Sequence, residues 1–265
     1  MERNAIKTLA IIPVRMTSQR LPGKPLAEIA GQTLVERVWR RACAAARVTK
    51  VCVATDSQEI ADVVRDFGGE TVMTGSDITT GSQRVAVASK LVEGAWDLVA
   101  NVQGDMPFIR PELIDTTIEF FAERKWDCSM ATAATPIFSE EVYRAPSDVK
   151  VVVSALGDAL YFSRSAIPHS RDGDWPNYTD RSGQVRTVYG YKHFGLYIFK
   201  PEVLAEYETN ELSPLENIEK LEQLRLLEKG HKIAACIVDP SLTDGSLEVD
   251  TPSDLDQARK LAAVA

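Results

Sequence analysis

A short polar loop near the start of the chain concentrates cationic and hydroxyl side chains within ten residues: Arg15, Thr17, Ser18, Arg20 and Lys24. These groups suit a triphosphate, because arginine forks and a lysine point charge neutralise phosphate oxygens. The loop is not a Walker motif, since Pro25 follows Gly23-Lys24 where that motif has Ser or Thr. An ordinary solvated basic loop is the alternative.

Two carboxylates are candidates for holding a divalent cation beside such phosphates. Asp105 closes Asn101-Val102-Gln103-Gly104-Asp105, a run that ends a buried strand. Carboxylates at such strand ends hold Mg²⁺ next to phosphates; a strand-end turn capped by Asp105 is the alternative. Asp250 precedes Thr251, which already supplies the N-cap of the following helix. Asp250 is therefore a candidate second ligand, or else a plain loop carboxylate.

Two helix starts carry further polar groups. Thr80-Gly81-Ser82 is a small-residue turn that could present backbone groups to a base edge or a phosphate. A second helix is expected to begin at Ser213-Pro214 with a capping box. Its polar face would carry Glu216, Glu219 and Gln223 at i, i+3 and i+7, opposite Ile218 and Leu221. That face could bind polyol hydroxyls or simply be solvated.

Covalent catalysis has little support in the sequence. His193 starts an apolar strand and could hydrogen-bond a ligand, whereas His231 follows Gly230 in a turn and is expected to be exposed. No Ser-His-Asp order or Cys-His pairing is compelling. The cysteines have no metal-site or redox spacing and are interpreted as reduced core thiols: Cys43, Cys52, Cys128 and Cys236.

The elements that must position these residues alternate between short apolar runs and helical patterns, as in βαβ units on a mostly parallel sheet. Buried strands are expected at 9–14, 51–55 and 98–102, and helices at 33–42, 56–67, 82–93 and 111–123. The basic loop directly follows the first strand. Doubly wound sheets bind nucleotides at such carboxyl ends of strands.

The second half of the chain reads differently. Extended runs at 149–154, 159–163 and 193–199 surround a polar stretch, 170–187, that we interpret as a long loop or flap. After the helix at Pro214, a strand at 232–238 and a final helix after Thr251-Pro252 close the chain.

Composition favours one globular α/β domain. The chain has 265 residues, of which 45% are hydrophobic and 26% charged. Its net charge of −8 disfavours nucleic acid and anionic membrane surfaces as partners. No apolar run is long enough to span a bilayer and no signal sequence is visible, so we expect a cytoplasmic protein without membrane insertion.

An ordered series of motifs resembles the 3-deoxy-manno-octulosonate (Kdo) cytidylyltransferases over roughly residues 8–258. The motifs are Ile12-Pro13-Val14-Arg15, Arg20-Leu21-Pro22-Gly23-Lys24-Pro25-Leu26, Val53-Ala54-Thr55-Asp56, Asn101-Val102-Gln103-Gly104-Asp105, Lys150-Val151-Val152, Tyr161-Phe162-Ser163-Arg164, Gly195-Leu196-Tyr197, Ser213-Pro214-Leu215-Glu216 and Val249-Asp250-Thr251-Pro252. The resemblance implies a Rossmann-like nucleotidyltransferase fold with a mostly parallel central sheet flanked by helices. It also implies a homodimer and Mg²⁺-dependent transfer of CMP from CTP to a sugar acid of lipopolysaccharide synthesis. A nucleotide-binding part, about 7–135, would precede an acceptor-binding and dimerisation part, about 136–265.

The resemblance also assigns roles residue by residue. Arg15, Lys24 and Asp105 would be catalytic, and the nucleotide would meet Arg15, Ser18, Lys24, Gly81 and Ser82. The metal would be held by Asp105 and Asp250. The acceptor would face Gln103, Arg164, His193, Glu216, Glu219 and Gln223.

The sequence departs from the family pattern at three places. Met106 replaces a customary Glu, Glu248 replaces a customary Gly, and residues 78–83 lack the usual His and acidic residue. The acceptor could therefore be Kdo, a modified octulosonate or a smaller acid such as a phosphonate. A non-catalytic, nucleotide-binding relative is the alternative from another class.

Overall fold

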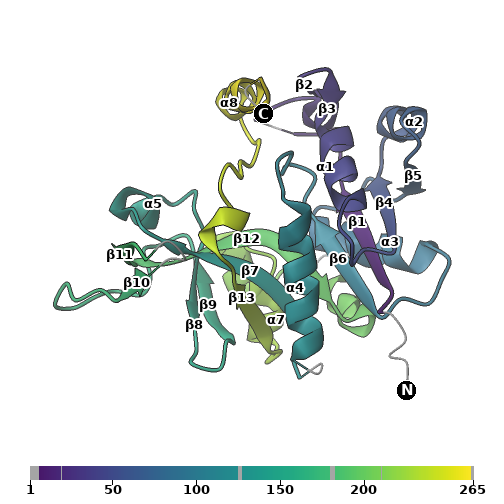
Figure 1. The fold of residues 1–265 in the computed structure, drawn as a ribbon. Coiled ribbons are helices and arrows are strands. Elements are labelled where there is room, and N and C mark those ends of the chain that lie inside the picture. The colour runs from purple at the N-terminus through teal and green to yellow at the C-terminus, as the bar shows by residue number, and fades with distance from the viewer. Residues whose placement is uncertain (1–5, 19, 125–126, 180–182, 210, 264–265) are drawn as a thin grey trace.

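The computed structural model describes residues 6–18, 20–124, 127–179, 183–209 and 211–263 (Figure 1). Over these residues a nine-stranded central sheet is flanked by helices, which confirms the predicted α/β class. Its strands are β1 (Thr8–Pro13), β4 (Lys50–Thr55), β5 (Glu70–Met73), β6 (Leu98–Val102), β7 (Met130–Ile137), β8 (Lys150–Val153), β9 (Ala159–Ser163), β12 (Gly190–Phe199) and β13 (Ile233–Ile237). The α-helices are α1 (Leu34–Cys43), α2 (Gln58–Asp66), α3 (Gly81–Leu91), α4 (Pro111–Glu123), α5 (Glu140–Arg144), α6 (Pro214–Glu219), α7 (Leu224–Glu228) and α8 (Pro252–Ala262).

The main path of the sheet runs β13-β7-β12-β6-β1-β4-β5, with β8 and β9 attached to β12. β1 pairs in parallel with both β4 and β6, whereas β12 runs antiparallel to its neighbours. The chain leaves β1 towards β4 and β5, then returns to β6 on the other side of β1. This reversal of strand order opens a crevice beyond the carboxyl ends of β1 and β6.

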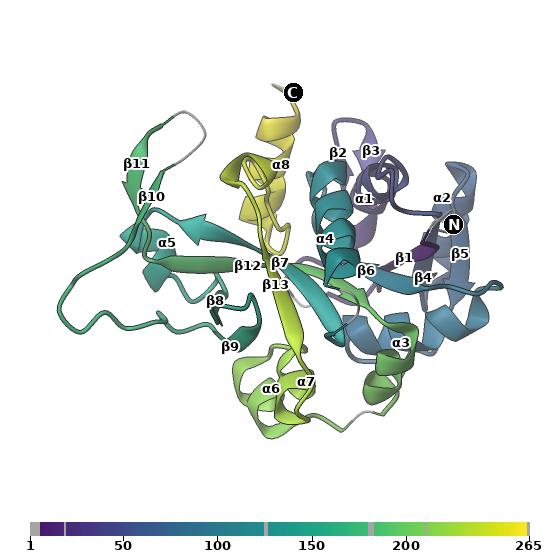
Figure 2. The ribbon, with the colours of Figure 1, turned by 60° about the horizontal axis from the view of Figure 1, so that its bottom comes forward.

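Alternating side chains of β1 explain why both faces of the sheet are covered. Ala10 and Ile12 belong to one apolar cluster, and Leu9 and Ile11 to another. Because successive strand residues point to opposite faces, a continuous apolar run requires helices on both sides. Figure 2 shows α1 and α4 on one side of the sheet and α3, α6 and α7 on the other.

Capping residues set the helix starts that the sequence predicts. Thr33 accepts a hydrogen bond from the Glu36 N–H at the start of α1, and Thr80 caps α3 in the same way. Thr251 and Asp254 form a capping box at α8. Each cap satisfies backbone donors that the first helical turn leaves unpaired.

The polar stretch predicted as a loop contains a small antiparallel hairpin, β10 (Asn177–Thr179) with β11 (Val185–Thr187). Residues 180–182 of that stretch, and Gln19 of the basic loop, lie outside the described residues. The pairing is stabilised by aromatic contacts: the Phe138 and Tyr178 ring centroids lie 5.7 Å apart, and the Arg186 guanidinium lies 3.7 Å from the Phe138 ring.

Two further expectations are wrong. Cys43 is exposed at the end of α1, although the other cysteines are buried thiols. His231 is half-buried rather than exposed, because its Nδ1 lies 2.9 Å from the Ser129 hydroxyl and its Nε2 3.7 Å from Glu206.

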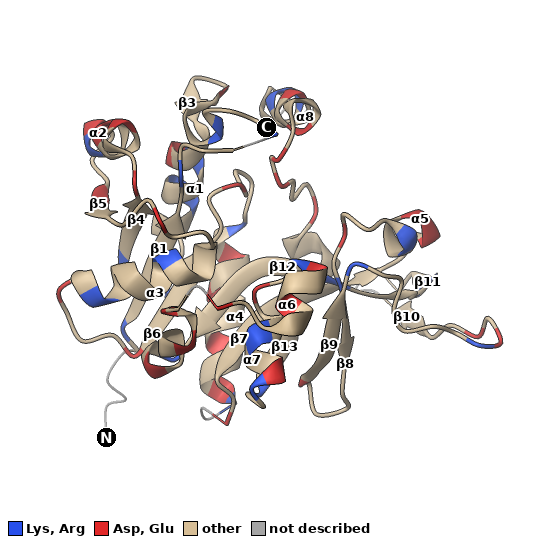
Figure 3. Ribbon diagram, turned by 180° about the vertical axis from the view of Figure 1, so that it is seen from behind, with Lys and Arg blue, Asp and Glu red and all other residues tan. Residues whose placement is uncertain are grey.

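Acidic and basic residues intermix on the outer helices, as Figure 3 shows for α2 and α8. Within the described ranges, no helix has the length and apolarity needed to cross a membrane.

Gly104 provides a test of the close approach between β6 and β1. A Cβ at this position would lie 2.4 Å from Val14 Cγ1 and 3.0 Å from the Pro13 carbonyl oxygen. We expect Gly104→Ala to lower the free energy of unfolding by about 1–3 kcal/mol through overpacking, measured by urea denaturation. Gly81→Ala is the control, because its new Cβ would come no closer than 3.3 Å to a side-chain atom. Equal stabilities of the two variants would contradict the prediction.

Candidate active site

A cavity of about 530 Å³ opens at the carboxyl ends of β1 and β6. Its wall contains eight of the thirteen residues to which the family resemblance assigned roles: Arg15, Ser18, Lys24, Gly81, Gln103, Asp105, Glu216 and Asp250. The other five, Ser82, Arg164, His193, Glu219 and Gln223, are not in its wall. The cavity therefore joins the basic loop, both candidate metal ligands and part of the candidate acceptor set.

Lys24 is the central cation of this cavity. It begins a short 3₁₀ helix (Lys24–Leu26), and Gly23 before it adopts the left-handed conformation at φ 69° that favours glycine. The Lys24 Nζ lies 2.9 Å from Asp250 Oδ1 and 3.1 Å from Asp105 Oδ2. One ammonium thus joins carboxylates from residues that are far apart in the sequence.

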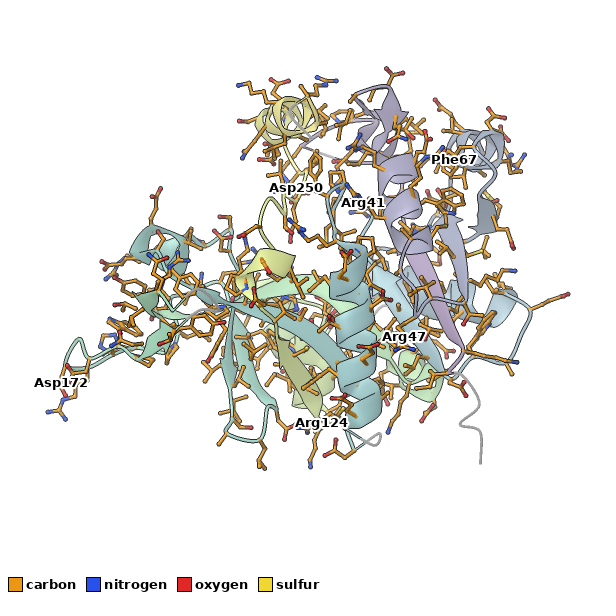
Figure 4. The ribbon with its side chains drawn as sticks, viewed as in Figure 1. Arg41, Arg47, Phe67, Arg124, Asp172 and Asp250 are labelled. Carbon is orange, nitrogen blue, oxygen red and sulfur yellow. The ribbon has the colours of Figure 1, made fainter. Side chains whose placement is uncertain are left out.

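Asp105 and Asp250 are brought together by the backbone as well. The Val249 N–H donates to the Asp105 carbonyl at 2.9 Å, and the α8 capping box follows directly. Val249 and Leu255 also pack in one apolar cluster with Ile29, which docks α8 on the segment after the basic loop. Figure 4 places Asp250 where the chain enters α8.

Opposite charges in this cluster stabilise one another. Burial opposes the ammonium of Lys24, but the nearby carboxylates of Asp105 and Asp250 outweigh it and raise the pKa of Lys24. Desolvation also opposes ionisation of Asp250, yet Lys24 and then Arg20 lower the pKa of that carboxyl. Lys24 and Asp250 are therefore both charged at neutral pH.

The rest of the basic loop surrounds the same cavity. Arg20 contacts Asp250 at 2.9 Å, while Arg15 donates to the Thr79 carbonyl at 3.3 Å. The Ser18 hydroxyl accepts from the Leu21 N–H at 3.2 Å and so holds the turn. Arg20 was among the loop cations that the sequence matched to a triphosphate, although the family resemblance gave it no role of its own.

The start of α3 is occupied by a carboxylate that sequence reasoning missed. Glu222 lines the cavity and accepts from the N–H groups of Gly81, at 3.0 Å, and Ser82, at 2.7 Å. A carboxylate is favoured there because the first turn of a helix presents unpaired N–H groups and a positive dipole end. In this arrangement neither N–H is open to a phosphate.

The expected helix face at Pro214 is wrong. α6 ends at Glu219, because Lys220 adopts a left-handed conformation at φ 55° and breaks the helical period before Gln223. Of the two residues expected opposite the polar face, Leu221 is buried but Ile218 is 75% exposed. The break at Lys220 also directs the Glu222 side chain to the start of α3. No sequence signal marks this break, since Lys is not a usual residue for the left-handed conformation.

Glu216 and Gln223, two of the polar side chains expected on this face, are buried rather than solvated. Glu216 is 3% exposed and forms a paired contact with Arg225, whose Nε and Nη2 lie 2.7 and 2.9 Å from its carboxylate oxygens. Gln223 is 1% exposed; its Oε1 accepts from the Tyr197 hydroxyl at 3.1 Å. Its Nε2 has no hydrogen-bond partner among the described residues.

Arg164 and Glu219 form a separate unit at the end of β9. Glu219 accepts from the Ser163 hydroxyl at 2.6 Å and from the Arg164 N–H at 3.0 Å. The Arg164 guanidinium donates to the carbonyl of Glu219 and to that of Pro146.

His193 is a core residue in this structure. It is buried, its Nε2 lies 2.9 Å from the Thr132 hydroxyl, and its ring packs edge-on against Phe162. Burial lowers the pKa of His193 to about 3, so the imidazole is neutral at physiological pH.

Asp105 and Asp250 have the donor chemistry that a hard divalent cation prefers. Mg²⁺ commonly takes one or two protein carboxylates together with substrate phosphates. Among the described residues no group of three or more His, Cys, Asp or Glu converges on one point. Asp105 and Asp250 already converge on the Lys24 ammonium. They therefore fit a cation whose remaining ligands come from phosphate oxygens, rather than one bound by protein groups alone.

Comparison with known proteins agrees with this geometry. Residues 9–233 match a family model described as cytidylyltransferase. A 3-deoxy-manno-octulosonate cytidylyltransferase of Geobacter sulfurreducens is 43% identical over 94% of this chain and 96% of its own length. One from Syntrophotalea carbinolica is 42% identical over 93% and 94%.

This chain belongs to the 3-deoxy-manno-octulosonate cytidylyltransferase family. A CMP:2-keto-3-deoxy-manno-octonic acid synthetase solved in complex with CTP superposes with a TM-score of 0.83 at 37% identity, covering 97% of this chain and 99% of the other. A cytidylyltransferase of Leptospira borgpetersenii shares the fold at 17% identity and a TM-score of 0.62, covering 98% and 88%.

Two of the three departures from the family pattern, Met106 and Glu248, lie outside the cavity wall, whereas the third, residues 78–83, contributes Thr79, Thr80 and Gly81 to it. Met106 is 2% exposed and packs in the apolar core under α4. Glu248 reaches solvent, yet desolvation in its recess and the carboxylate of Asp105 raise its pKa to about 7. Neither substitution removes a contact of Lys24, Asp105 or Asp250.

The burial of His193 predicts a pH dependence of stability. The imidazole has a pKa near 6.5 in the unfolded chain and of about 3 in the folded protein. As the pH falls below 6.5, the unfolded state therefore binds a proton that the folded state does not, which favours unfolding. Stability from this group is complete above about pH 6.5 and falls by up to ~1.4 kcal/mol per pH unit towards pH 3. Urea denaturation should show a shallower loss in His193→Gln than in wild type. Parallel pH dependences would contradict the assignment of a neutral buried imidazole.

Proposed function

We propose that this protein transfers CMP from CTP to Kdo and releases pyrophosphate. The observation that carries the proposal is the cluster of Lys24, Asp105 and Asp250 at the strand-order reversal, in a chain whose relatives carry that activity in their names. A triphosphate needs cations, and the metal that accompanies it needs carboxylates; this cavity supplies both.

The triphosphate lies against the basic loop. Arg15 and Lys24 neutralise its oxygens, with Ser18 beside them, and Gly81 forms the neighbouring wall. The carboxylate of Glu222 at the start of α3 repels phosphate from that part of the cavity. The triphosphate is thereby confined to the end of the cavity formed by the basic loop. Ser82, buried behind Gly81, supports that wall.

Asp105 and Asp250 would hold Mg²⁺ when nucleotide is bound. There the ion would supply positive charge to the phosphate oxygens and favour ionisation of the attacking hydroxyl. Lys24 would exchange its carboxylate partners for phosphate oxygens and so leave both carboxylates free to bind the ion. The flexible four-carbon stem of lysine allows the exchange without backbone movement.

The reaction needs no covalent enzyme intermediate. The acceptor hydroxyl attacks the α-phosphorus of CTP, a new oxygen–phosphorus bond forms, and the bond to pyrophosphate breaks. Arg15 and Lys24 stabilise the charge that moves onto the leaving pyrophosphate. Holding the two substrates in line accounts for most of the acceleration.

The acceptor lies towards the second half of the chain. Gln103 and Glu216 reach the cavity wall, and Gln223 offers a buried, unpartnered amide donor. Arg164 and Glu219 hold the backbone next to the same region in place. His193 packs in the core behind that region as a neutral residue. The hydroxyls and carboxylate of a sugar acid match such a set of donors and acceptors.

The wider assignments follow the family. We propose a nucleotide-binding part at about 7–135 and an acceptor-binding and dimerisation part at about 136–265, whose limit falls within β7. The protein would be a cytoplasmic homodimer that supplies an activated sugar acid for lipopolysaccharide synthesis. Sedimentation equilibrium measures the dimer directly, and a monomer at micromolar concentration would contradict it.

Pyrophosphate release tests the function. We expect Mg²⁺-dependent release from CTP with Kdo, measured against an amino-octulosonate, a sialic acid and small phosphonates. Lys24→Met should lower the rate by about a hundredfold or more, because a charge-stabilising donor is lost.

Lys7→Met is the matched control, since Lys7 is an exposed lysine at the opposite end of β1. Release with another acid and not with Kdo would overturn the choice of acceptor. Silence with every acceptor would favour a non-catalytic relative.

A further inference from the structure

Lys150 is a fully buried cation that the proposed reaction does not use. Its side chain is 0% exposed. The Nζ donates to three backbone carbonyls: Ala145 at 2.8 Å, Asp148 at 2.5 Å and Arg164 at 2.7 Å. The three ammonium hydrogens thus match three carbonyl acceptors.

The three carbonyls come from separate places that meet at one end of the β8–β9 hairpin. Ala145 caps α5, Asp148 lies in the loop before β8, and Arg164 follows β9. Figure 1 shows β8 and β9 extending away from α5, so this meeting point is at the base of the hairpin and its turn is at the far end. Without a cation, three carbonyl oxygens would face one another in a buried space, which is unfavourable.

Arg164 is fixed from both sides of its backbone. Lys150 holds its carbonyl, and Glu219 accepts from its N–H at 3.0 Å. Its guanidinium then reaches the carbonyls of Glu219, at 2.9 Å, and Pro146, at 3.2 Å. Pro146 lies between Ala145 and Asp148, so the loop that receives the guanidinium is the loop that Lys150 holds.

We propose that Lys150 is a positioning residue for acceptor binding, acting through Arg164 and the 145–148 loop. This inference rests on the proposed function, in which Arg164 and Glu219 support the acceptor side of the cavity. Nucleotide contacts come from the basic loop and are independent of Lys150. Loss of the ammonium should therefore affect the acceptor and spare CTP.

Lys150→Met tests this inference, because methionine keeps an unbranched side chain of similar length and removes the charge and all donors. We expect the KM for the acceptor to rise by about tenfold and the KM for CTP to change by less than about twofold. Lys150→Arg keeps donors for the same carbonyls, so its acceptor KM should lie closer to that of wild type. It also provides a second variant if Lys150→Met does not fold.

Arg124→Met is the matched control. Arg124 binds the Leu156 carbonyl and Asp158 at the turn of the same hairpin, and it does not touch Arg164. Both Met variants should lower Tm, but only Lys150→Met should raise the acceptor KM. Equal acceptor KM values in the two Met variants, or a CTP KM that rises in parallel, would overturn the positioning role. Wild-type turnover of CTP with Kdo tests the proposed function separately, because it involves no variant.

Discussion

One ammonium shared by two carboxylates organises the cavity at the carboxyl ends of β1 and β6. Lys24 lies between Asp105 and Asp250, whose carboxylates raise the pKa of the ammonium, and Lys24 in turn lowers the pKa of Asp250. Partly buried charges are tolerated only when they are paired, so the three side chains must stay together in the absence of ligand. In the proposed function a metal–triphosphate complex uses the same three charges in a different pairing: phosphate oxygens take the ammonium and the metal takes the carboxylates. Under that proposal, the contacts that hold the site together are the ones that the substrate replaces.

At this cavity the fold brings together three segments that are distant in the sequence. β1 delivers the basic loop and β6 delivers Asp105, because the strand order reverses between them. Gly104 permits the close approach of the two strand ends. Asp250 arrives from the C-terminal part through the backbone bond of Val249 to Asp105 and the seating of α8.

The sequence was sufficient to predict the elements that depend on interactions between residues close together in the chain. The apolar run of β1, the Thr caps and the acid after β6 all lie where they were expected, because periodicity and capping act within a few residues. The sequence did not predict the end of α6 at Lys220, where the left-handed backbone of this lysine stops the helix early. As a result the Glu222 side chain lies at the start of α3. The buried pair of Glu216 and Arg225 joins the segments on either side of Lys220, a tertiary contact that local sequence patterns do not reveal. Eight of the thirteen residues that the family resemblance assigned line the cavity, but the resemblance did not reveal that Glu222 accepts hydrogen bonds from the N–H groups of Gly81 and Ser82.

The exchange of partners at Lys24 is the central claim, and cation affinity without nucleotide tests it most directly. Calorimetric titration with Mg²⁺ or Mn²⁺ would compare wild type, Lys24→Met and the exposed-lysine control Lys7→Met. Removal of the competing ammonium leaves Asp105 and Asp250 unpaired by Lys24, so Lys24→Met should bind the cation about tenfold more tightly than wild type or the control. Equal or weaker binding by Lys24→Met would contradict the account, because the ammonium and the metal would then not share the same carboxylates.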